Sequence, residues 1–152
     1  MSGLFDHWHA PEASREPCVF CGIAQGTIPA NVVYEDAATV AFVDQRQFHP
    51  GHTLVIPRQH LADVRELDER TGAALMATVA KVTTAIGKAF PNEGISLWSS
   101  IGPAAFQEVP HLHFHVHPRR TDDGFLRVYP GDPPVAEASQ LEEYAATLRR
   151  FL

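Results

Sequence analysis

Four histidines alternate with apolar residues in one short segment, the densest group of chemically active side chains in the sequence. The segment reads His111, Leu112, His113, Phe114, His115, Val116, His117. In a strand, side chains alternate between two faces, and same-face neighbours lie about 6.7 Å apart. The pattern predicts a half-buried strand with a row of imidazoles on its outer face, which ordinary solvated strands fill with Thr, Lys, Glu or Arg. Such a row suits metal ligation, or acid–base and nucleophilic chemistry near neutral pH.

The two cysteines of the chain form a C-x-x-C pair, Cys18 and Cys21. In a reducing compartment this spacing indicates a metal half-site or a redox motif. Two histidines would complete a four-ligand tetrahedral shell. A thioredoxin-like pair would follow a strand, and the sequence predicts none before Cys18. Free thiols are the remaining alternative.

The elements that carry these groups follow from hydrophobic periodicity. A short helix over 18–25 carries both cysteines and stops at Gly26. Residues 32–35 and 39–44 form a predicted hairpin, and 53–58 a buried strand. A long helix follows Asp68 as N-cap, with one apolar stripe consisting of Leu75, Val79, Val82, Ile86 and Phe90.

The second half of the chain supplies two more strands and a final helix. The strands cover 95–99 and 111–117, and residues 100–110 form a loop between them. A capping-box pattern at Ser139 opens a helix that runs to Leu152, with Leu141, Tyr144 and Leu148 along one side. The expected fold class is α+β, with a mainly antiparallel sheet of about five strands, one long helix and a C-terminal helix.

Composition restricts the partners that this protein can have. The chain has 152 residues and a net charge of −6, so we expect no nucleic-acid binding, which needs a basic surface. No apolar run is long enough for a membrane span. The first residues lack the regions of a secretory signal, so we expect a cytoplasmic protein. Residues 1–16 are expected to form a flexible arm, and 17–152 a single domain.

The histidine segment resembles the signature of the histidine triad (HIT) family, in which three histidines alternate with apolar residues. The similarity extends over about residues 17 to 120, in Ile28-Pro29-Ala30, Val33-Tyr34-Glu35-Asp36, the run 50–58 and Gln107-Glu108-Val109. The resemblance implies a HIT-like fold, a homodimer and a nucleotide hydrolase or nucleotidyl transferase. Its substrate would be a nucleoside phosphoramidate or dinucleoside polyphosphate, cleaved at the α-phosphate to release a nucleoside monophosphate.

The resemblance also implies roles for the phosphate-binding residues. His113 would be the nucleophile that forms a nucleotidyl-histidine, later hydrolysed by water. His115 would contact a phosphate oxygen or the leaving atom, and His52 would lie beside the phosphate. Backbone N–H groups of the 106–109 segment, here including Gln107, Glu108 and Val109, would stabilise charge on the α-phosphate.

The nucleoside end is implied by the same resemblance. Asp44 would accept hydrogen bonds from the ribose hydroxyls, and Phe20, Ile23 and Phe42 would line the pocket for a purine base. Ser100 stands where the family often has an amide side chain that contacts the substrate, and Phe106 stands where it often has glycine. Because both changes lie at the rim, a nucleotide-binding protein with negligible turnover is the alternative function.

The resemblance assigns a structural zinc ion to the cysteine pair. His60 and His111 would complete the shell with Cys18 and Cys21, and a closed shell would not activate water. His52, His113 and His115 would remain for phosphate. His117 replaces an apolar residue of the signature and has no assigned role. An iron-dependent, cupin-like enzyme using His111, His113 and His115 is a less favoured reading, because no carboxylate stands at the usual spacing.

Overall fold

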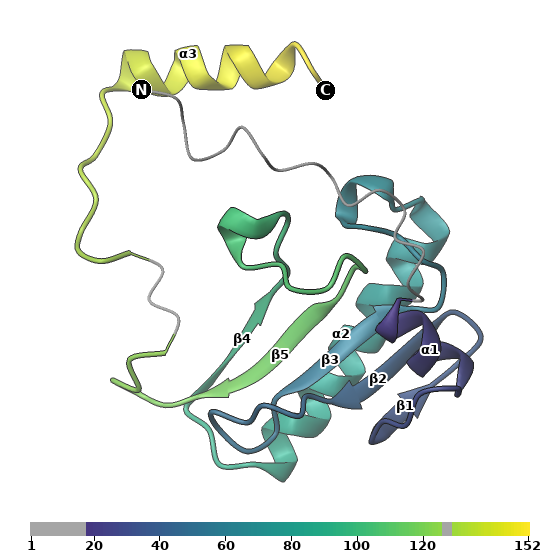
Figure 1. Ribbon diagram of the computed structural model, residues 1–152. Helices are drawn as coiled ribbons and strands as arrows, with labels where there is room; N and C mark the ends of the chain where they lie inside the picture. The colour runs from purple at the N-terminus through teal and green to yellow at the C-terminus, as the bar shows by residue number, and fades with distance from the viewer. Residues whose placement is uncertain (1–17, 126–128) are drawn as a thin grey trace, which may run out of the picture. The chain divides into compact units, whose positions relative to one another are not determined.

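The computed structural model describes residues 18–125 and 129–152 and divides the chain into two units (Figure 1). The first unit extends to Thr121 and the second covers Asp122–Leu152. The predicted N-terminal arm, residues 1–16, lies outside the described residues. None of the described helices combines the length and apolar character that a bilayer crossing needs.

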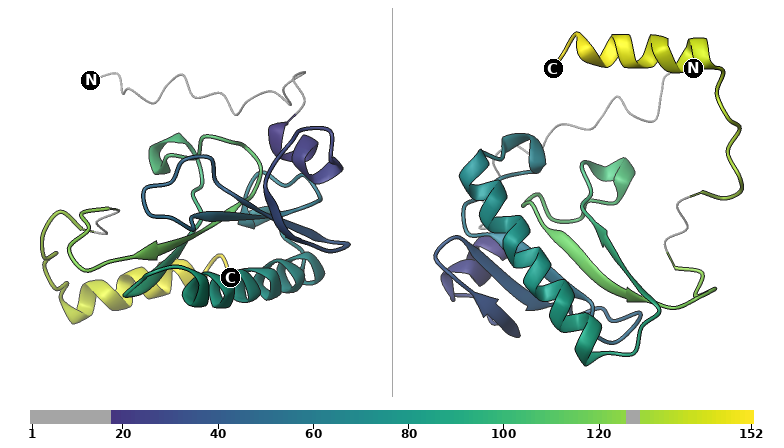
Figure 2. Two further views of the ribbon diagram at one scale, coloured as in Figure 1. Left: turned by 90° about the horizontal axis from the view of Figure 1, so that it is seen from below. Right: turned by 180° about the vertical axis from the view of Figure 1, so that it is seen from behind.

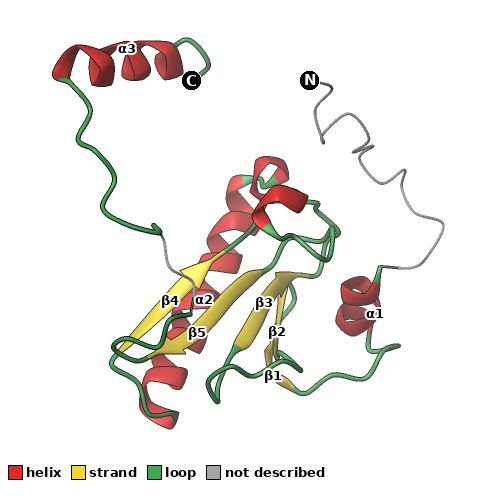
Figure 3. Cartoon of the chain, turned by 60° about the vertical axis from the view of Figure 1, so that its left-hand side comes forward, coloured by secondary structure: helices red, strands yellow, loops and turns green. Residues whose placement is uncertain are grey.

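The first unit is built on a five-stranded sheet in which every neighbouring pair is antiparallel. The strands are β1 (Val32–Glu35), β2 (Thr39–Val43), β3 (Thr53–Pro57), β4 (Gly94–Trp98) and β5 (Phe114–Arg119). Their order is β1-β2-β3-β5-β4, so β1 and β4 are the edges (Figure 3). The predicted α+β class and the antiparallel sheet are confirmed, with strand ends shifted by at most three residues.

A long helix, α2 (Glu69–Ala89), covers one face of the sheet. The Asp68 carboxylate accepts a hydrogen bond from the backbone N–H of Thr71, which confirms the predicted N-cap. The predicted stripe packs on the sheet through Leu75, Val79, Val82 and Ile86, all buried. Phe90, the last predicted stripe residue, has left the helix for an extended backbone and is 37% exposed.

A short helix, α1 (Val19–Gln25), lies on the opposite face (Figure 2, left). Gly26 ends it in a left-handed conformation at φ 77°, as the sequence predicts. Because strand residues alternate in direction, β2 contributes Ala41 to the core beneath α2, and Val40 and Phe42 to the core beneath α1. The interior strands β2 and β3 are therefore buried on both faces.

The histidine segment differs from its prediction in two ways. β5 begins only at Phe114, because the backbone N–H of Leu112 bonds to Leu61 O at 2.6 Å instead of joining the sheet. The alternation of faces persists, since Leu112 and Val116 enter the core beneath α2. The imidazole row is not solvated, however: the exposed fractions of His111, His113 and His117 are 0%, 6% and 0%. The row therefore lies on the predicted face, opposite the residues that enter the core beneath α2, but that face is covered rather than open to solvent.

Two short 3₁₀ turns, Val64–Glu66 and Pro103–Ala105, lie in the connections of the first unit, and the second unit contains α3 (Ala138–Arg149). The N-cap of α3 is Glu137, whose backbone N–H donates to the Gln140 side chain, so the predicted cap at Ser139 is wrong. The helix also ends three residues before Leu152. None of its residues is buried.

Candidate functional site

The predicted metal ligands come together from three parts of the chain. Cys18 and Cys21 lie at the start of α1, His60 follows β3, and His111 precedes β5. Each offers one ligand atom, and these atoms all lie within 4.8 Å of one another. The Nδ1 atom of His111 is 3.5 Å from both sulfur atoms, and Nδ1 of His60 is 3.2 Å from the Cys21 Sγ.

The donor set and its spacing fit a tetrahedral zinc ion. Zn–S and Zn–N bonds of about 2.3 and 2.0 Å give sulfur–nitrogen separations of about 3.5 Å at the tetrahedral angle. The Nε2–H of His111 donates to the carbonyl of Pro57 at 2.9 Å, which leaves the Nδ1 lone pair free to bind a metal ion. Burial and the neighbouring Cys18 raise the pKa of Cys21 to about 11, so a cation must replace its proton for the thiolate to form at neutral pH.

His113 has its proton fixed on one nitrogen. Its Nδ1 lies 2.7 Å from the carbonyl oxygen of His111, which can only accept, so Nδ1 carries the proton. The lone pair therefore resides on Nε2. The edge of the Phe20 ring packs against the imidazole at a centroid distance of 5.1 Å. Burial lowers the pKa of His113 below its usual value, and this favours the neutral form of the ring.

A relay of two hydrogen bonds fixes His52 and His115. The Nδ1–H of His52 donates to the Arg46 carbonyl at 3.2 Å, so its Nε2 accepts a hydrogen bond of 2.9 Å from Nδ1–H of His115. The lone pair of His115 is consequently on Nε2, as in His113. Burial, reinforced by three nearby histidines, lowers the pKa of His115 to about 3. The free Nε2 of His115 is therefore a hydrogen-bond acceptor.

Trp98 is a part of this site that sequence reasoning missed. Its indole stacks on the His115 ring at a centroid distance of 4.4 Å and an angle of 6°. The two residues are direct partners in the register of β4 and β5. The only signal in the sequence was a large aromatic residue at the end of a strand, which does not show which histidine it faces.

Asp44 lies immediately after β2 and beside the relay. One of its carboxylate oxygens accepts the backbone N–H of Arg46, and the other is 3.7 Å from His52 Nδ1. The Gln47 amide N–H₂ group donates to the carbonyls of Asp44 and His52 and holds the two residues on one loop. The structure therefore brings Asp44 and His52 together, and their roles toward a nucleotide stay predictions.

The predicted base-pocket residues lie in the core beneath α1. Phe20 and Phe42 are 7% and 4% exposed and meet edge to face at 5.4 Å. Ile23 and Val109 pack against the same cluster. The contact of Phe20 with His113 places this apolar group next to the imidazole of His113. Its role toward a base stays a prediction.

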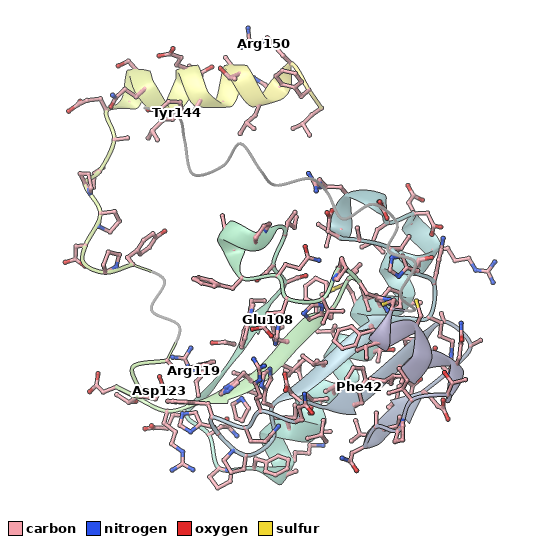
Figure 4. All side chains as sticks on the ribbon, viewed as in Figure 1. Phe42, Glu108, Arg119, Asp123, Tyr144 and Arg150 are labelled. Carbon is pink, nitrogen blue, oxygen red and sulfur yellow. The ribbon has the colours of Figure 1, made fainter. Side chains whose placement is uncertain are left out.

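The segment before β5 is held in place by its side chains. The Gln107 amide donates to the Ala62 carbonyl at 2.8 Å and accepts from Gly102 N–H at 2.9 Å. Glu108, which is labelled in Figure 4, pairs with Arg46 at 3.1 Å, and both side chains are exposed. Phe106 has φ 62°, a conformation that favours glycine, and its side chain is 88% exposed. Ser100 follows β4, two residues beyond Trp98.

The antiparallel sheet, the single long helix and the histidines before and along β5 define an α+β protein with an imidazole-based site. The chain belongs to the HIT domain family, whose sequence profile matches residues 25–122.

Two curated relatives have names that state an activity. The chain is 37% identical over 125 residues to adenosine 5'-monophosphoramidase hnt1 of Schizosaccharomyces pombe, covering 80% of this chain and 91% of the relative. It is 34% identical over 109 residues to adenylylsulfatase HINT3 of Arabidopsis thaliana, covering 72% of this chain and 55% of that protein. A crystal structure of a HIT family member from Bacillus subtilis superposes with a TM-score of 0.84 at 34% identity, covering 90% of this chain and 98% of the other.

Proposed function

We propose that this protein is a nucleotide hydrolase or nucleotidyl transferase that cleaves at the α-phosphate of a nucleoside phosphoramidate or dinucleoside polyphosphate and releases a nucleoside monophosphate. The observation that carries the proposal is the proton position in His113. Its Nδ1–H is held by the His111 carbonyl, so the Nε2 lone pair is available for attack. The names of the two relatives, a phosphoramidase and an adenylylsulfatase, support a hydrolase that acts on nucleotides.

The proposed reaction has two steps at one phosphorus atom. Nε2 of His113 attacks the α-phosphorus, a P–N bond forms, and the bond to the leaving group breaks as that group takes a proton. Water then breaks the P–N bond and restores the neutral imidazole. The negative phosphate beside His115 raises the pKa of that ring, so that it can hold a proton near the leaving atom. Asp44 would accept the ribose hydroxyls, and the cluster around Phe20 would contact a purine base.

The test is a labelling experiment with α-labelled adenosine phosphoramidate. Wild-type protein is expected to carry acid-labile label after quenching and to release labelled AMP. His113→Ala is expected to lose the label and at least about 10³-fold of the turnover. His49→Ala is the matched control, since it removes a histidine outside the reaction. Equal turnover by wild type and His113→Ala would show that His113 is not the nucleophile.

The second candidate function is nucleotide binding with negligible turnover. It is favoured by Phe106, which puts a large side chain on a strained turn beside the expected phosphate site. A single-turnover assay separates the two functions. Binding of AMP without labelling of wild-type protein supports the binding role.

We also propose a structural zinc ion held by Cys18, Cys21, His60 and His111. It would link α1 to the segment before β5 and supply no step of the reaction.

We also propose that the protein forms a homodimer through the β4 edge of the sheet. β1 carries a register irregularity between Val32 and Tyr34, which protects an edge, whereas β4 is regular and its Leu97 is 46% exposed.

A further inference from the structure

A groove lies on the face of the sheet opposite the histidines. It has a volume of about 540 Å³, within the range of small-molecule sites. Its walls come from the C-terminal half of α2, from β1 and β2, and from the loop before β3. The apolar lining includes Val33, Val43, Val82, Ala85, Ala89 and Phe90. None of the described histidines contributes to the lining.

The shape of the groove is set by small residues on one wall and a fixed floor. Ala85 and Ala89 are exposed on α2, where larger side chains would fill the space. Gly51 forms part of the floor at φ 111°, and a Cβ atom there would lie 2.7 Å from the Phe90 ring. Phe90 is therefore seated directly on the backbone of Gly51, and its ring closes one end of the groove.

The other end of the groove carries a positive charge. Lys81 is the one ionised side chain among the residues that line it, and these belong to the described part of the chain. Its Nζ donates to the Tyr34 hydroxyl at 3.0 Å, and that hydroxyl donates to Asp36 at 3.0 Å. The contact holds the ammonium group beside the apolar walls, in a chain whose net charge is −6.

We propose that the groove binds a small anionic amphiphile, a medium-chain carboxylate, with its tail between α2 and the sheet and its head at Lys81. The distance along α2 from Lys81 to Phe90 is about 14 Å, which suits a single extended chain. The walls supply hydrophobic burial, and the ammonium group supplies charge complementarity for a carboxylate. This site is independent of the proposed nucleotide chemistry.

The sheet separates the groove from the nucleotide site. Gln47, Gly51 and Thr53 contact the groove, while Asp44 and His52 of the same loop lie with the histidine relay. Thr53 and Val55 face α2, whereas Leu54 and Ile56 belong to the core beneath α1. Saturating AMP is therefore expected to leave carboxylate binding in place.

The experiment measures binding of decanoate to the full chain by isothermal titration calorimetry. Decyltrimethylammonium, with the same tail and the opposite charge, is expected to bind at least about tenfold more weakly. Lys81→Gln is expected to weaken decanoate about tenfold, whereas the matched variant Lys88→Gln, on the same helix outside the groove, keeps the wild-type affinity. Ala85→Leu is expected to abolish binding, and Ala77→Leu, also outside the groove, to preserve it.

Four results would overturn the proposal. Equal affinity for decanoate and decyltrimethylammonium removes the charge recognition. Displacement of decanoate by AMP places the ligand in the nucleotide site. Unchanged binding in an Ala85→Leu variant that keeps the wild-type melting temperature shows that the ligand lies elsewhere. If the groove binds no decanoate and Ala85→Leu changes the oligomeric state, the groove is the binding site of a second copy of the chain.

Discussion

Backbone carbonyls, which can only accept hydrogen bonds, fix the proton on a different ring nitrogen in His111 and in His113. The Pro57 carbonyl holds Nε2–H of His111, so its Nδ1 faces the cysteines. The His111 carbonyl holds Nδ1–H of His113, so its Nε2 carries the lone pair. Two residues of one type, two positions apart, thereby present different ring nitrogens, which suit the metal ligation and the nucleophilic attack that we propose. The backbone, rather than the side chain itself, selects the role.

Trp98 positions His115 by stacking, and its removal tests that role. The parallel contact at 4.4 Å holds the ring in the plane that its hydrogen bond to His52 requires. Trp98→Leu is expected to lower kcat roughly tenfold and to change KM less than about threefold, because the reacting geometry is lost while the substrate still binds. Steady-state kinetics on adenosine phosphoramidate give both constants.

The aromatic variant Trp98→Phe is the control for this prediction, since it keeps a flat ring against His115. It is expected to retain most of the wild-type kcat. If Trp98→Phe and Trp98→Leu lose kcat equally while their melting temperatures match, stacking does not position His115.

At the residue scale, the sequence could identify chemistry but not contacts. His52, His60 and Asp44 were found because a family pattern places them, and the structure brings each beside its expected neighbours. Trp98 was missed because the register between β4 and β5 decides its partner, and register depends on pairing across 17 residues of sequence. The burial of His117 was missed because it depends on tertiary contacts with the loop before β3.

The short helix α1 depends on tertiary contacts for its stability. It has seven residues, fewer than an isolated helix needs, and only Phe20, Gly22 and Ala24 are buried. A zinc ion bound by Cys18, Cys21, His60 and His111 would fix it to the segment before β5. The metal is therefore expected to contribute strongly to the stability of this part of the molecule.

Cys18→Ser tests the zinc proposal. Wild-type protein is expected to contain about one zinc ion per chain, and the variant to lose most of it, because serine is a poor zinc ligand. The melting temperature of the variant should fall to that of wild type treated with a chelator. Elemental analysis and calorimetry measure the two effects, with His49→Ala as the control that keeps its zinc. An unchanged zinc content in Cys18→Ser refutes the shell.

The proposed homodimer can be tested at the edge strand β4. Leu97→Lys places a charge on an exposed apolar position of a regular edge, so it is expected to convert a dimer to monomers. Val32→Lys, on the irregular edge β1, should leave the dimer intact. Sedimentation velocity distinguishes the species. A dimer that survives the first variant and dissociates in the second would assign the interface to β1.

Elements with strong periodicity were predictable, and their ends were predictable only where the signal is local in sequence. The stripe of α2 and its Asp68 cap were confirmed because both are local in sequence. The predicted start of β5 was wrong because the Leu112 N–H donates to the carbonyl of Leu61, which lies 51 residues earlier in the sequence. In α3, Ser139 and Glu137 both lie near the first turn, and only the backbone conformation shows that the helix begins after Glu137.

For the molecule as a whole, the two faces of the sheet carry different kinds of side chain. The face beneath α2 carries an apolar core and a groove, and the other collects polar rings around β5. These rings cluster closely, with centroid distances of 4.7 Å between His52 and His117 and 5.1 Å between His52 and His115. Concentrating neutral imidazoles in this way makes the stability of the folded chain depend on pH.

The direction of that dependence follows from the histidine pKa values. Burial lowers the pKa of His117 to about 4 and that of His115 to about 3, whereas an unfolded histidine has a pKa of about 6.5. Between these values the unfolded chain binds more protons, so stability is fully present above pH 6.5 and falls as the pH decreases. One such histidine lowers the free energy of unfolding by about 2 kcal/mol between pH 7 and pH 5.

The melting temperature of the chelator-treated protein is therefore expected to fall by about 5 °C or more from pH 7 to pH 5. Removing metal from both samples separates imidazole protonation from loss of a bound ion. His117→Asn should show a smaller fall over the same interval, because one of the groups that must stay neutral is gone. A melting temperature that is constant or higher at pH 5 would mean that these rings accept protons in the folded state as readily as in the unfolded chain, which their burial opposes.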